Sequence, residues 1–306
     1  MSGHSFNGHR PVMLNEVLES LSPRDGASYI DGTFGGGGYT TAILEAADCR
    51  VLGIDRDPDA IARGQTLVER FAGRLTLVQG EFSNMDQFAE SSDGIVLDLG
   101  VSSFQFDQPA RGFSFREDGP LDMRMSLSGE SAADFVNSAG HSELASVIAR
   151  FGEEKNARRI ASAIIAARPV TGTAQLARIV SDAQGPAALR HAIHPATRTF
   201  QALRIHVNDE LGELERGLDA SLKILKPQGR LVVVSFHSLE DRIVKQFLNS
   251  RSRAAPRGSR HAPVSAPRHA AFELLTTRPR TPSAEELSSN PRARSAKLRA
   301  GLKLAA

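Results

Sequence analysis

Four consecutive glycines, residues 35–38, constrain this chain more than any other feature. They follow a short apolar segment that ends in a carboxylate, Tyr29–Asp31, and they precede a segment with helical character that starts at Tyr39. Glycines at a strand-to-helix turn let the backbone adopt positive φ and let a ligand approach where a Cβ would block it. A second acid, Asp55, ends the next apparent strand, where an acid typically holds the hydroxyls of a ribose. This order of elements predicts a site for an adenosine-containing cofactor.

The acid before the glycines, Asp31, bears on which cofactor this is. It would repel the pyrophosphate of a dinucleotide, whereas it suits the ammonium and sulfonium centres of S-adenosylmethionine. Three other interpretations stay open at this point: a dehydrogenase with a nicotinamide cofactor, a non-catalytic RNA-binding or assembly module, and a flexible glycine loop without a ligand. The residues of this stretch that we predict to bind S-adenosylmethionine are Asp31, Gly35, Gly36, Gly37, Gly38 and Asp55.

Composition sets the class of protein. The 306 residues are 41% hydrophobic and 24% charged, which is ordinary for a soluble globular chain of more than one domain. The single cysteine, Cys49, cannot form an intramolecular disulfide, and no Cys/His cluster has zinc spacing, so no metal site is predicted. Because the first residues are polar and no apolar run approaches the length of a membrane span, we expect a cytoplasmic protein without a signal peptide or membrane contact.

Strand and helix patterns alternate through the first hundred residues and return near the end. Apolar strands buried on both faces and separated by helices predict an α/β fold with a doubly wound, mostly parallel sheet. Ligands of such sheets bind at the carboxyl ends of the strands. Asp31, Asp55, Phe82 and Asp98 all fall there or just after, although Phe82 suits a core aromatic as well as a ring over adenine. The expected strands are Tyr29–Asp31, Arg50–Asp55, Leu75–Gln79, Gly94–Gly100, Arg230–Val234, Ala271–Thr276 and Ala296–Leu304.

The pattern of residue types changes after Val101. A long irregular segment rich in Gly, Ser, Phe and Arg leads into four helical patterns with no strand between them. We interpret residues 107–194 as an all-helical insertion into a sheet domain made of residues 1–106 and 195–306. The basic residues of the insertion form solvated faces by default. Residues 251–271 are rich in arginine and lack acids, which predicts a flexible basic loop suited to a polyanion or simply to solvent.

Two patterns follow the insertion. Apolar residues recur at helical spacing from Phe200 to Leu218, so we expect one face of this segment to lie in the core. His237 follows the strand Arg230–Val234, on the ligand side of the sheet, where a structural histidine and a functional one are about equally expected. Ser238 and Asp241 have the spacing of a capping box for the next helix.

Several longer motifs resemble the ribosomal small-subunit methyltransferase H family, and they span nearly the whole chain. They are Asp31–Gly35, Asp98–Ser103, Arg111–Phe115, Asp118–Met125, His194–Asn208, Ser235–Arg242 and Asn290–Arg299.

This resemblance implies a class I S-adenosylmethionine-dependent methyltransferase with a Rossmann-like domain and an all-helical inserted domain. The implied reaction is methylation of N4 of a cytidine in the decoding region of 16S rRNA, on the small ribosomal subunit. It also implies that the helical insertion forms one wall of the RNA site. The oligomeric state stays open, and a homodimer is possible. The cofactor contacts that it implies are Gly37, Gly38, Tyr39, Asp55, Phe82, Asp98 and Gln105.

For the transfer itself, we expect a carboxylate to accept an N–H of the exocyclic amine and so expose its lone pair, and Asp98 could do this. His237 is a second catalytic candidate. Arginines and aromatic residues suit an unstacked RNA base held by stacking and by its phosphates. The arginines that we expect to contact RNA are Arg111, Arg116, Arg124, Arg198, Arg204 and Arg242.

The chain departs from the family pattern at a few positions. Tyr39 stands where histidine is common, Phe104 where proline is common, and Ser126 where aspartate is common. Tyr39 can still donate its backbone N–H to the cofactor, whereas Phe104 could reshape the loop beside Asp98. The Asp-Pro-Pro-Tyr motif of many amino-group methyltransferases is replaced by Asp98-Leu99-Gly100.

Overall fold

The computed structural model describes residues 11–186, 193–252 and 270–305, and the chain divides into two compact units. We call Met1–Gly100 with Leu211–Ala306 the sheet unit, and Val101–Glu210 the helical unit. The bounds of the helical unit differ from the expected insertion, residues 107–194, at both ends. Most of the expected basic loop, residues 251–271, lies outside the described residues.

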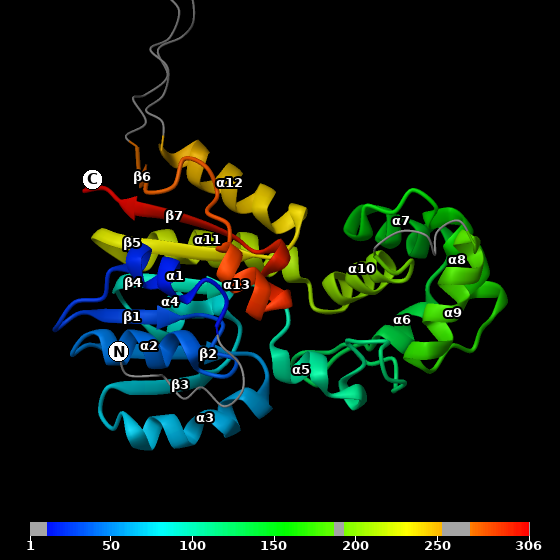
Figure 1. Cartoon of the computed structure of the whole chain (residues 1–306), viewed down its shortest axis with the longest axis horizontal. Coiled ribbons are helices and arrows are strands. Elements are labelled where there is room, and N and C mark those ends of the chain that lie inside the picture. Colours follow the sequence, from blue (N-terminus) through cyan, green and yellow to red (C-terminus); the bar gives the residue numbers. More distant parts are fainter. Residues whose placement is uncertain (1–10, 187–192, 253–269, 306) are drawn as a thin grey trace, which may run out of the picture. The chain divides into compact units, whose positions relative to one another are not determined.

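The sheet unit is built on one seven-stranded sheet with the order β3-β2-β1-β4-β5-β7-β6. The first five strands in this order are mutually parallel, and β7 runs antiparallel to both of its neighbours. The predicted doubly wound, mostly parallel sheet is therefore confirmed (Figure 1). The strands are β1 Ser28–Asp31, β2 Arg50–Asp55, β3 Leu75–Gln79, β4 Ser92–Asp98, β5 Leu225–Ser235, β6 Phe272–Leu274 and β7 Lys297–Lys303.

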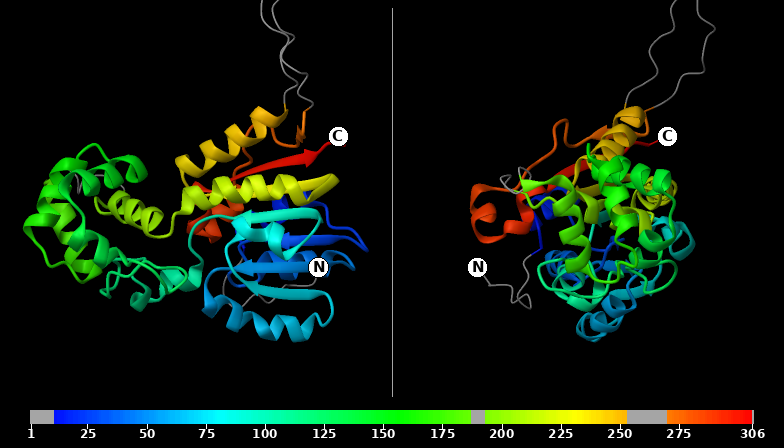
Figure 2. Two further views of the ribbon diagram at one scale, coloured as in Figure 1. Left: turned by 180° about the vertical axis from the view of Figure 1, so that it is seen from behind. Right: turned by 90° about the vertical axis from the view of Figure 1, so that its right-hand side faces the viewer.

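Side chains alternate between the two faces along the central strands and so contribute to two cores, one on each face of the sheet. In β5, Val232 and Val234 pack with α1, α2 and α3, whereas Leu231 and Val233 pack with α4, α11 and α12. Helices cover both faces of the sheet (Figure 2). Both faces are therefore apolar, which explains why the central strands are hydrophobic at nearly every position. The helices of this unit are α1 Leu14–Leu21, α2 Gly38–Ala46, α3 Pro58–Arg70, η1 Phe82–Asn84, α4 Met85–Phe88, α11 Glu210–Ile224, α12 Ser238–Ser252, α13 Ala284–Ser289 and η4 Pro291–Ser295.

The helical unit has its own apolar core, formed by residues of α6 to α10 together with the segment between η2 and α6. The four helices expected within the insertion are all present. In the described residues of this unit, the strand-like pairing is limited to one isolated bridge between Pro120 and Gly172. Its helices are α5 Ser103–Asp107, η2 Pro109–Arg111, α6 Ala132–Ser138, α7 His141–Gly152, α8 Ala157–Ala166, α9 Thr173–Gln184 and α10 Thr197–Val207.

The apolar face from Phe200 to Leu218 packs in the core as expected, but it is divided between two helices and two cores. The chain breaks between α10 and α11, where Asp209 has a φ of 46°. Phe200 packs in the core of the helical unit, whereas Leu218 packs in the core of the sheet unit. The side chain of Asn208 favours this break because its amide exchanges hydrogen bonds with the carbonyl of Met123 and the N–H of Met125, each 2.8 Å long. The unit boundary therefore falls after α10, later than expected.

Within the described residues, the structure contains no helix that is both long and apolar enough to cross a membrane.

Candidate active site at the carboxyl edge of the sheet

The glycine turn joins β1 to α2 and adopts the predicted positive-φ backbone at two of its positions. Gly35 has a φ of 52° and Gly37, which precedes the first residue of α2, has a φ of 73°. A Cβ on Gly38 would lie 2.3 Å from Cγ of Pro11, so Pro11 can pack here only because Gly38 has no side chain. No side chain caps the start of α2. The N–H of Thr40 in its first turn donates to Asp31, which leaves the N–H groups of Gly38 and Tyr39 for a ligand.

Gly36 differs from the two glycines beside it. It is exposed in the turn, and its φ is not positive, whereas Gly35 and Gly37 both have positive φ. The expected reason for a glycine, a backbone conformation that other residues avoid, is therefore wrong at Gly36. The contact of Gly36 with the cofactor stays a prediction.

A buried ring that the sequence analysis did not identify, Phe34, fixes the shape of this turn. The added Cβ atoms of Gly37, Gly53 and Gly64 would each come within 3 Å of the Phe34 ring. These glycines lie in the turn, in β2 and in α3 respectively, so the ring occupies space that three elements leave open. Phe34 thereby locks the turn against the sheet. Glycines in the turn, in β2 and in α3 are the sequence signal that could have revealed it.

Asp31, at the end of β1, is 1% exposed and is held by two threonines. One carboxylate oxygen accepts from the backbone N–H of Thr33 at 3.2 Å, and the other accepts from the hydroxyl of Thr40 at 2.8 Å. Burial, together with the negative charge of Asp55, raises the pKa of Asp31 to about 6, although the two threonines oppose this shift. Asp31 is thus a poorly compensated buried carboxyl group that a nearby cation would stabilise.

Asp55 ends β2 and connects the glycine turn to the next helix. Its carboxylate accepts from the N–H of Gly35 at 2.7 Å and from the N–H of Asp57 at 2.8 Å. Asp57 in turn caps α3. Burial raises the pKa of Asp55. Since a carboxylate oxygen has two lone pairs, each oxygen can still accept a bond from a ribose hydroxyl, as the sequence predicts.

Asp98 ends β4, and its carboxylate is the least compensated of the three. Its backbone N–H donates to the hydroxyl of Thr33 at 2.6 Å, which ties the ends of β4 and β1 together. Among the described residues, the buried Oδ1 atom has no hydrogen-bond partner. Burial, followed by the charges of Asp31 and Glu240, holds the pKa of Asp98 well above its usual range. An acceptor of this kind is satisfied by a donor or a cation from a ligand.

Phe82 follows β3, and its ring packs in the direction of the core. A Cβ on Gly217 of α11 would lie 2.4 Å from two of its ring carbons, so Gly217 makes room for it. Its backbone N–H donates to Glu213 at 3.1 Å, and Glu213 pairs with Arg56 at 2.8 Å. Burial raises the pKa of Glu213 to about 7 in spite of the Arg56 charge. The ring is only partly buried, so a role over adenine remains a prediction beside its packing role.

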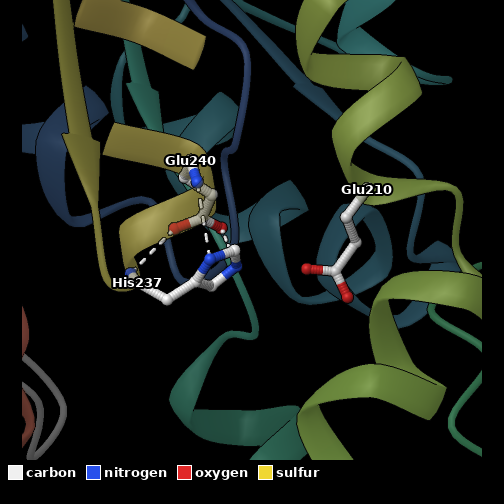
Figure 3. A group of neighbouring side chains, drawn as sticks. All are labelled: Glu210, His237 and Glu240. Atoms are coloured by element: carbon white, nitrogen blue, oxygen red, sulfur yellow. Dashed lines mark hydrogen bonds and ion pairs between the residues drawn. The ribbon is translucent and has the colours of Figure 1, made fainter. Parts of the chain in front are cut away.

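His237 lies in the turn between β5 and α12, where the contacts favour the structural alternative (Figure 3). Its Nδ1 accepts from the N–H of Glu240 at 3.4 Å. Its Nε2 lies 3.1 Å from the Glu240 carboxylate, an ion-pair distance but off the line of a hydrogen bond. Because the backbone N–H and the carboxylate of Glu240 both lie against the ring, these contacts favour a structural role for His237.

The expected capping box at the start of α12 is replaced by Glu240. Its carboxylate accepts from the N–H of Phe236 at 2.8 Å and from the N–H of His237 at 3.2 Å. Asp241 instead pairs with Arg299 at 2.7 Å. The buried Glu240 was missed because an acid inside a helix start is normally assigned to solvent.

Three arginines expected to contact RNA are engaged within the helical unit. Arg111 is 6% exposed and donates to the carbonyls of Arg124 and Met125, which removes it as a direct phosphate contact. Arg124 pairs with Asp122 at 2.6 Å, and Arg204 pairs with Glu210 through two bonds of 2.8 Å. These three hold the fold of the helical unit. The other three, Arg116, Arg198 and Arg242, are exposed residues.

Gln105 also belongs to the helical unit. It is 5% exposed, and its side-chain oxygen accepts from the N–H of Ser102 at 3.0 Å in a capping box. Gln105 is therefore fixed by the start of α5, and its contact with the cofactor stays a prediction.

The residues of the sheet unit fit S-adenosylmethionine. A turn without Cβ atoms precedes an uncapped helix start, Asp55 retains acceptor capacity, and the buried Oδ1 atom of Asp98 lacks a partner among the described residues. Asp31 and Asp98 together favour a ligand with positive charge.

Comparison with known proteins decides the family. A sequence model of the MraW methylase family matches residues 6–304. The chain belongs to the MraW methylase family. As a member it is an S-adenosylmethionine-dependent methyltransferase, which confirms the predicted cofactor and excludes the dehydrogenase and the non-catalytic module.

Curated proteins are similar to this chain over nearly its full length. The chain is 57% identical over 305 residues to the ribosomal RNA small subunit methyltransferase H of Hyphomonas neptunium, with 97% of this chain and 89% of the relative covered. It is 54% identical over 310 residues to the protein of the same name from Granulibacter bethesdensis, with 97% and 92% covered. Among solved structures, a putative methyltransferase from Streptococcus mutans in complex with SAH matches with a TM-score of 0.44 and 12% identity, with 97% and 99% covered.

Proposed function

We propose that this enzyme methylates N4 of a cytidine in the decoding region of 16S rRNA, on the small ribosomal subunit. The names of the relatives that are 54% to 57% identical support an rRNA substrate. The motifs noted in the sequence support the base and the atom. The proposal places the enzyme in the cytoplasm and is compatible with a monomer and with a homodimer.

The buried Oδ1 atom of Asp98 has no hydrogen-bond partner in the described part of the chain, and this observation carries the chemical part of the proposal. The exocyclic amine of cytosine is a weak nucleophile because its lone pair is delocalised into the ring. A carboxylate that accepts one N–H of this amine favours the geometry in which the lone pair is exposed. Oδ1 of Asp98 is buried at the carboxyl end of β4, without a partner among the described residues, and can take this bond.

The charge state of Asp98 supports the same role. The carboxyl group lies near Asp31 and Glu240, and its raised pKa favours the protonated form in the free enzyme. A positive charge bound beside it lowers the pKa and restores the carboxylate. Bound S-adenosylmethionine supplies the methyl group and a sulfonium charge. The bound methyl donor therefore favours the acceptor form of Asp98.

Thr33 and Thr40 act in this proposal as positioning residues. Thr33 accepts from the N–H of Asp98 and donates its own N–H to Asp31, so it fixes the distance between the two acids. Thr40 fixes Asp31 from the first turn of α2. This frame holds the reacting groups in place before substrate binds, and such positioning is the main contribution of a methyltransferase.

For RNA binding, we propose that the helical unit forms one wall of the RNA site. Arg116 and Arg198 are exposed on this unit, and Arg242 is exposed on α12 of the sheet unit. Guanidinium groups bind phosphates well because their planar donors match the phosphate oxygens.

A deletion strain tests the proposed substrate. We expect 16S rRNA from a strain that lacks this protein to lose N4-methylated cytidine at one position in the decoding region. A plasmid copy of the wild-type gene should restore it. The measurement is mass spectrometry of the nucleosides from that RNA fragment. Unchanged N4-methylated cytidine in the deletion strain would refute the substrate assignment.

A further inference from the structure

An exposed histidine of the helical unit, His194, is held in one orientation. Its Nδ1 accepts from the N–H of Ala196 at 3.1 Å, and its carbonyl accepts from the N–H of Thr197 at 3.0 Å. These bonds fix the imidazole at the entrance to α10. Because Nδ1 is an acceptor here, the neutral ring carries its proton on Nε2. A rigid aromatic ring on a loop is an uncommon feature for a surface that serves only solvation.

Phe115 packs against the ring of His194, and Phe200 packs against Phe115. The centroid of Phe115 lies 4.7 Å from that of His194 with the planes tilted by 40°, and Phe115 also lies 4.7 Å from Phe200 in an edge contact. Phe200 is 5% exposed and belongs to the core of the helical unit, whereas Phe115 is half-buried. These ring contacts therefore run from the core outward and end at the exposed imidazole of His194.

Two exposed arginines lie close to these rings in the sequence. Arg116 follows Phe115 directly, and its guanidinium lies over the ring of Phe106 at 5.6 Å. Arg198 lies in the first turn of α10, 4.0 Å from Glu154, with 55% of its side chain exposed. An aromatic platform between guanidinium groups is the usual composition of a surface that binds single-stranded nucleic acid, because every base has a π face and every nucleotide a phosphate.

We propose that His194, supported by Phe115, stacks an unpaired base of the RNA substrate, while Arg116 and Arg198 contact the neighbouring phosphates. This inference rests on the proposed function and adds a specific base-binding residue to it. His194 touches RNA in this proposal but none of the reacting atoms, so its loss weakens RNA binding and leaves the transfer step intact.

Two substitutions separate the ring of His194 from its local bond. H194N removes the ring, but the asparagine oxygen can still accept the N–H two residues on, as in an Asx turn. H194F keeps a ring for stacking and loses the bond. H141N is the matched control because His141 is also exposed on the helical unit, and its Nε2 contacts Ser162 at 2.9 Å. Thermal melting of each variant checks that the fold is retained.

The probe is a fluorescein-labelled single-stranded RNA of the decoding region, measured by fluorescence anisotropy. We expect H194N to raise the Kd for this RNA about tenfold, as for the loss of one stacked base. We expect H194F and H141N to stay within about twofold of wild type. In methyl transfer to small subunits, H194N should raise KM for the subunit by a similar factor with kcat nearly unchanged, and the Kd for S-adenosylmethionine should not change.

Two results would overturn the inference. One is an H194N variant that binds the labelled RNA as tightly as wild type. The other is an H194F variant that loses as much affinity as H194N, since a ring that stacks a base should be replaceable by another ring. If wild type fails to methylate the subunit, the proposed function is wrong, and the ratio of Kd values for H194N and wild type still decides the role of His194.

Discussion

The D98N enzyme should bind S-adenosylmethionine and lose at least about 100-fold in kcat for methyl transfer. The substitution preserves the shape of the side chain and removes its charge. If the role of Asp98 is to accept an N–H of the amine as a carboxylate, a neutral amide replaces it poorly. The measurement is single-turnover transfer from labelled cofactor to small subunits, with cofactor affinity from calorimetry. D48N is the control because Asp48 is a surface acid whose side chain is 85% exposed.

The same substitution should leave the protein as stable as wild type or more stable at neutral pH. The pKa of Asp98 is raised in the folded state from its ordinary 3.8, so the folded protein binds a proton more tightly than the unfolded chain does. Stability therefore falls as pH rises from about 4 toward the raised pKa, because ionising this carboxyl group beside Asp31 and Glu240 is unfavourable. D98N removes this loss, and its Tm should fall less steeply than that of wild type between pH 5 and pH 8.

These two outcomes together distinguish a functional Asp98 from a structural one. A structural carboxylate would give lower stability together with lower activity. A D98N enzyme with full turnover would remove Asp98 from the chemistry, whatever its effect on Tm.

The G37A enzyme should lose measurable cofactor binding. Gly37 has a φ of 73°, where an alanine is strained by roughly 1–2 kcal/mol. Its Cβ would also lie 2.5 Å from Leu67 and 2.9 Å from the ring of Phe34. Since Phe34 locks the turn, its displacement moves the start of α2, where the free N–H groups lie. We expect at least about a 100-fold rise in the Kd for S-adenosylmethionine by calorimetry.

The chain offers a matched control for this prediction. Gly73 has a φ of 76° in the turn before β3, but a Cβ there meets no heavy atom within 4 Å. G73A therefore introduces the same backbone strain without the collision. It should lower the free energy of unfolding by about 1 kcal/mol and leave cofactor affinity unchanged. If G37A and G73A bound cofactor equally well, the turn would not be the binding element.

The sheet could be predicted well from the sequence because its strands are buried on both faces. Arg50–Asp55 and Leu75–Gln79 were predicted with the bounds that β2 and β3 have. A strand covered on both sides is apolar at nearly every position, and such runs are hard to mistake when turns bound them. Asp31 and Asp98 could be predicted at the carboxyl ends for the same reason.

The roles of the two threonines and of the phenylalanine beside Asp31 and Asp98 could not be predicted from such apolar runs. Thr33, Thr40 and Phe34 have no periodicity of their own, and their roles depend on which strands become neighbours. The contact of Thr33 with Asp98 joins residues that are 65 positions apart. Only the parallel pairing of β1 with β4 brings them together.

The division of the apolar face between two helices and the burial of Arg111 could not be predicted, and the physical reason is the same for both. The apolar stripe from Phe200 to Leu218 keeps helical spacing, so periodicity alone cannot show that Asp209 interrupts it. Arg111 lies in a loop with other arginines, and a charged loop residue is normally exposed. Its burial is decided by the carbonyls of Arg124 and Met125, which only the folded loop brings within reach.

Methyl transfer with purified components tests the central claim most directly. The protein is incubated with S-adenosylmethionine labelled in its methyl group and with small ribosomal subunits from a strain that lacks it. The 16S rRNA is then cut into fragments and its nucleosides are separated. We predict label in N4-methylcytidine from the decoding-region fragment, and at least about 100-fold less with D98N. Label in another nucleoside or fragment, or none although the cofactor binds, would contradict the proposed function.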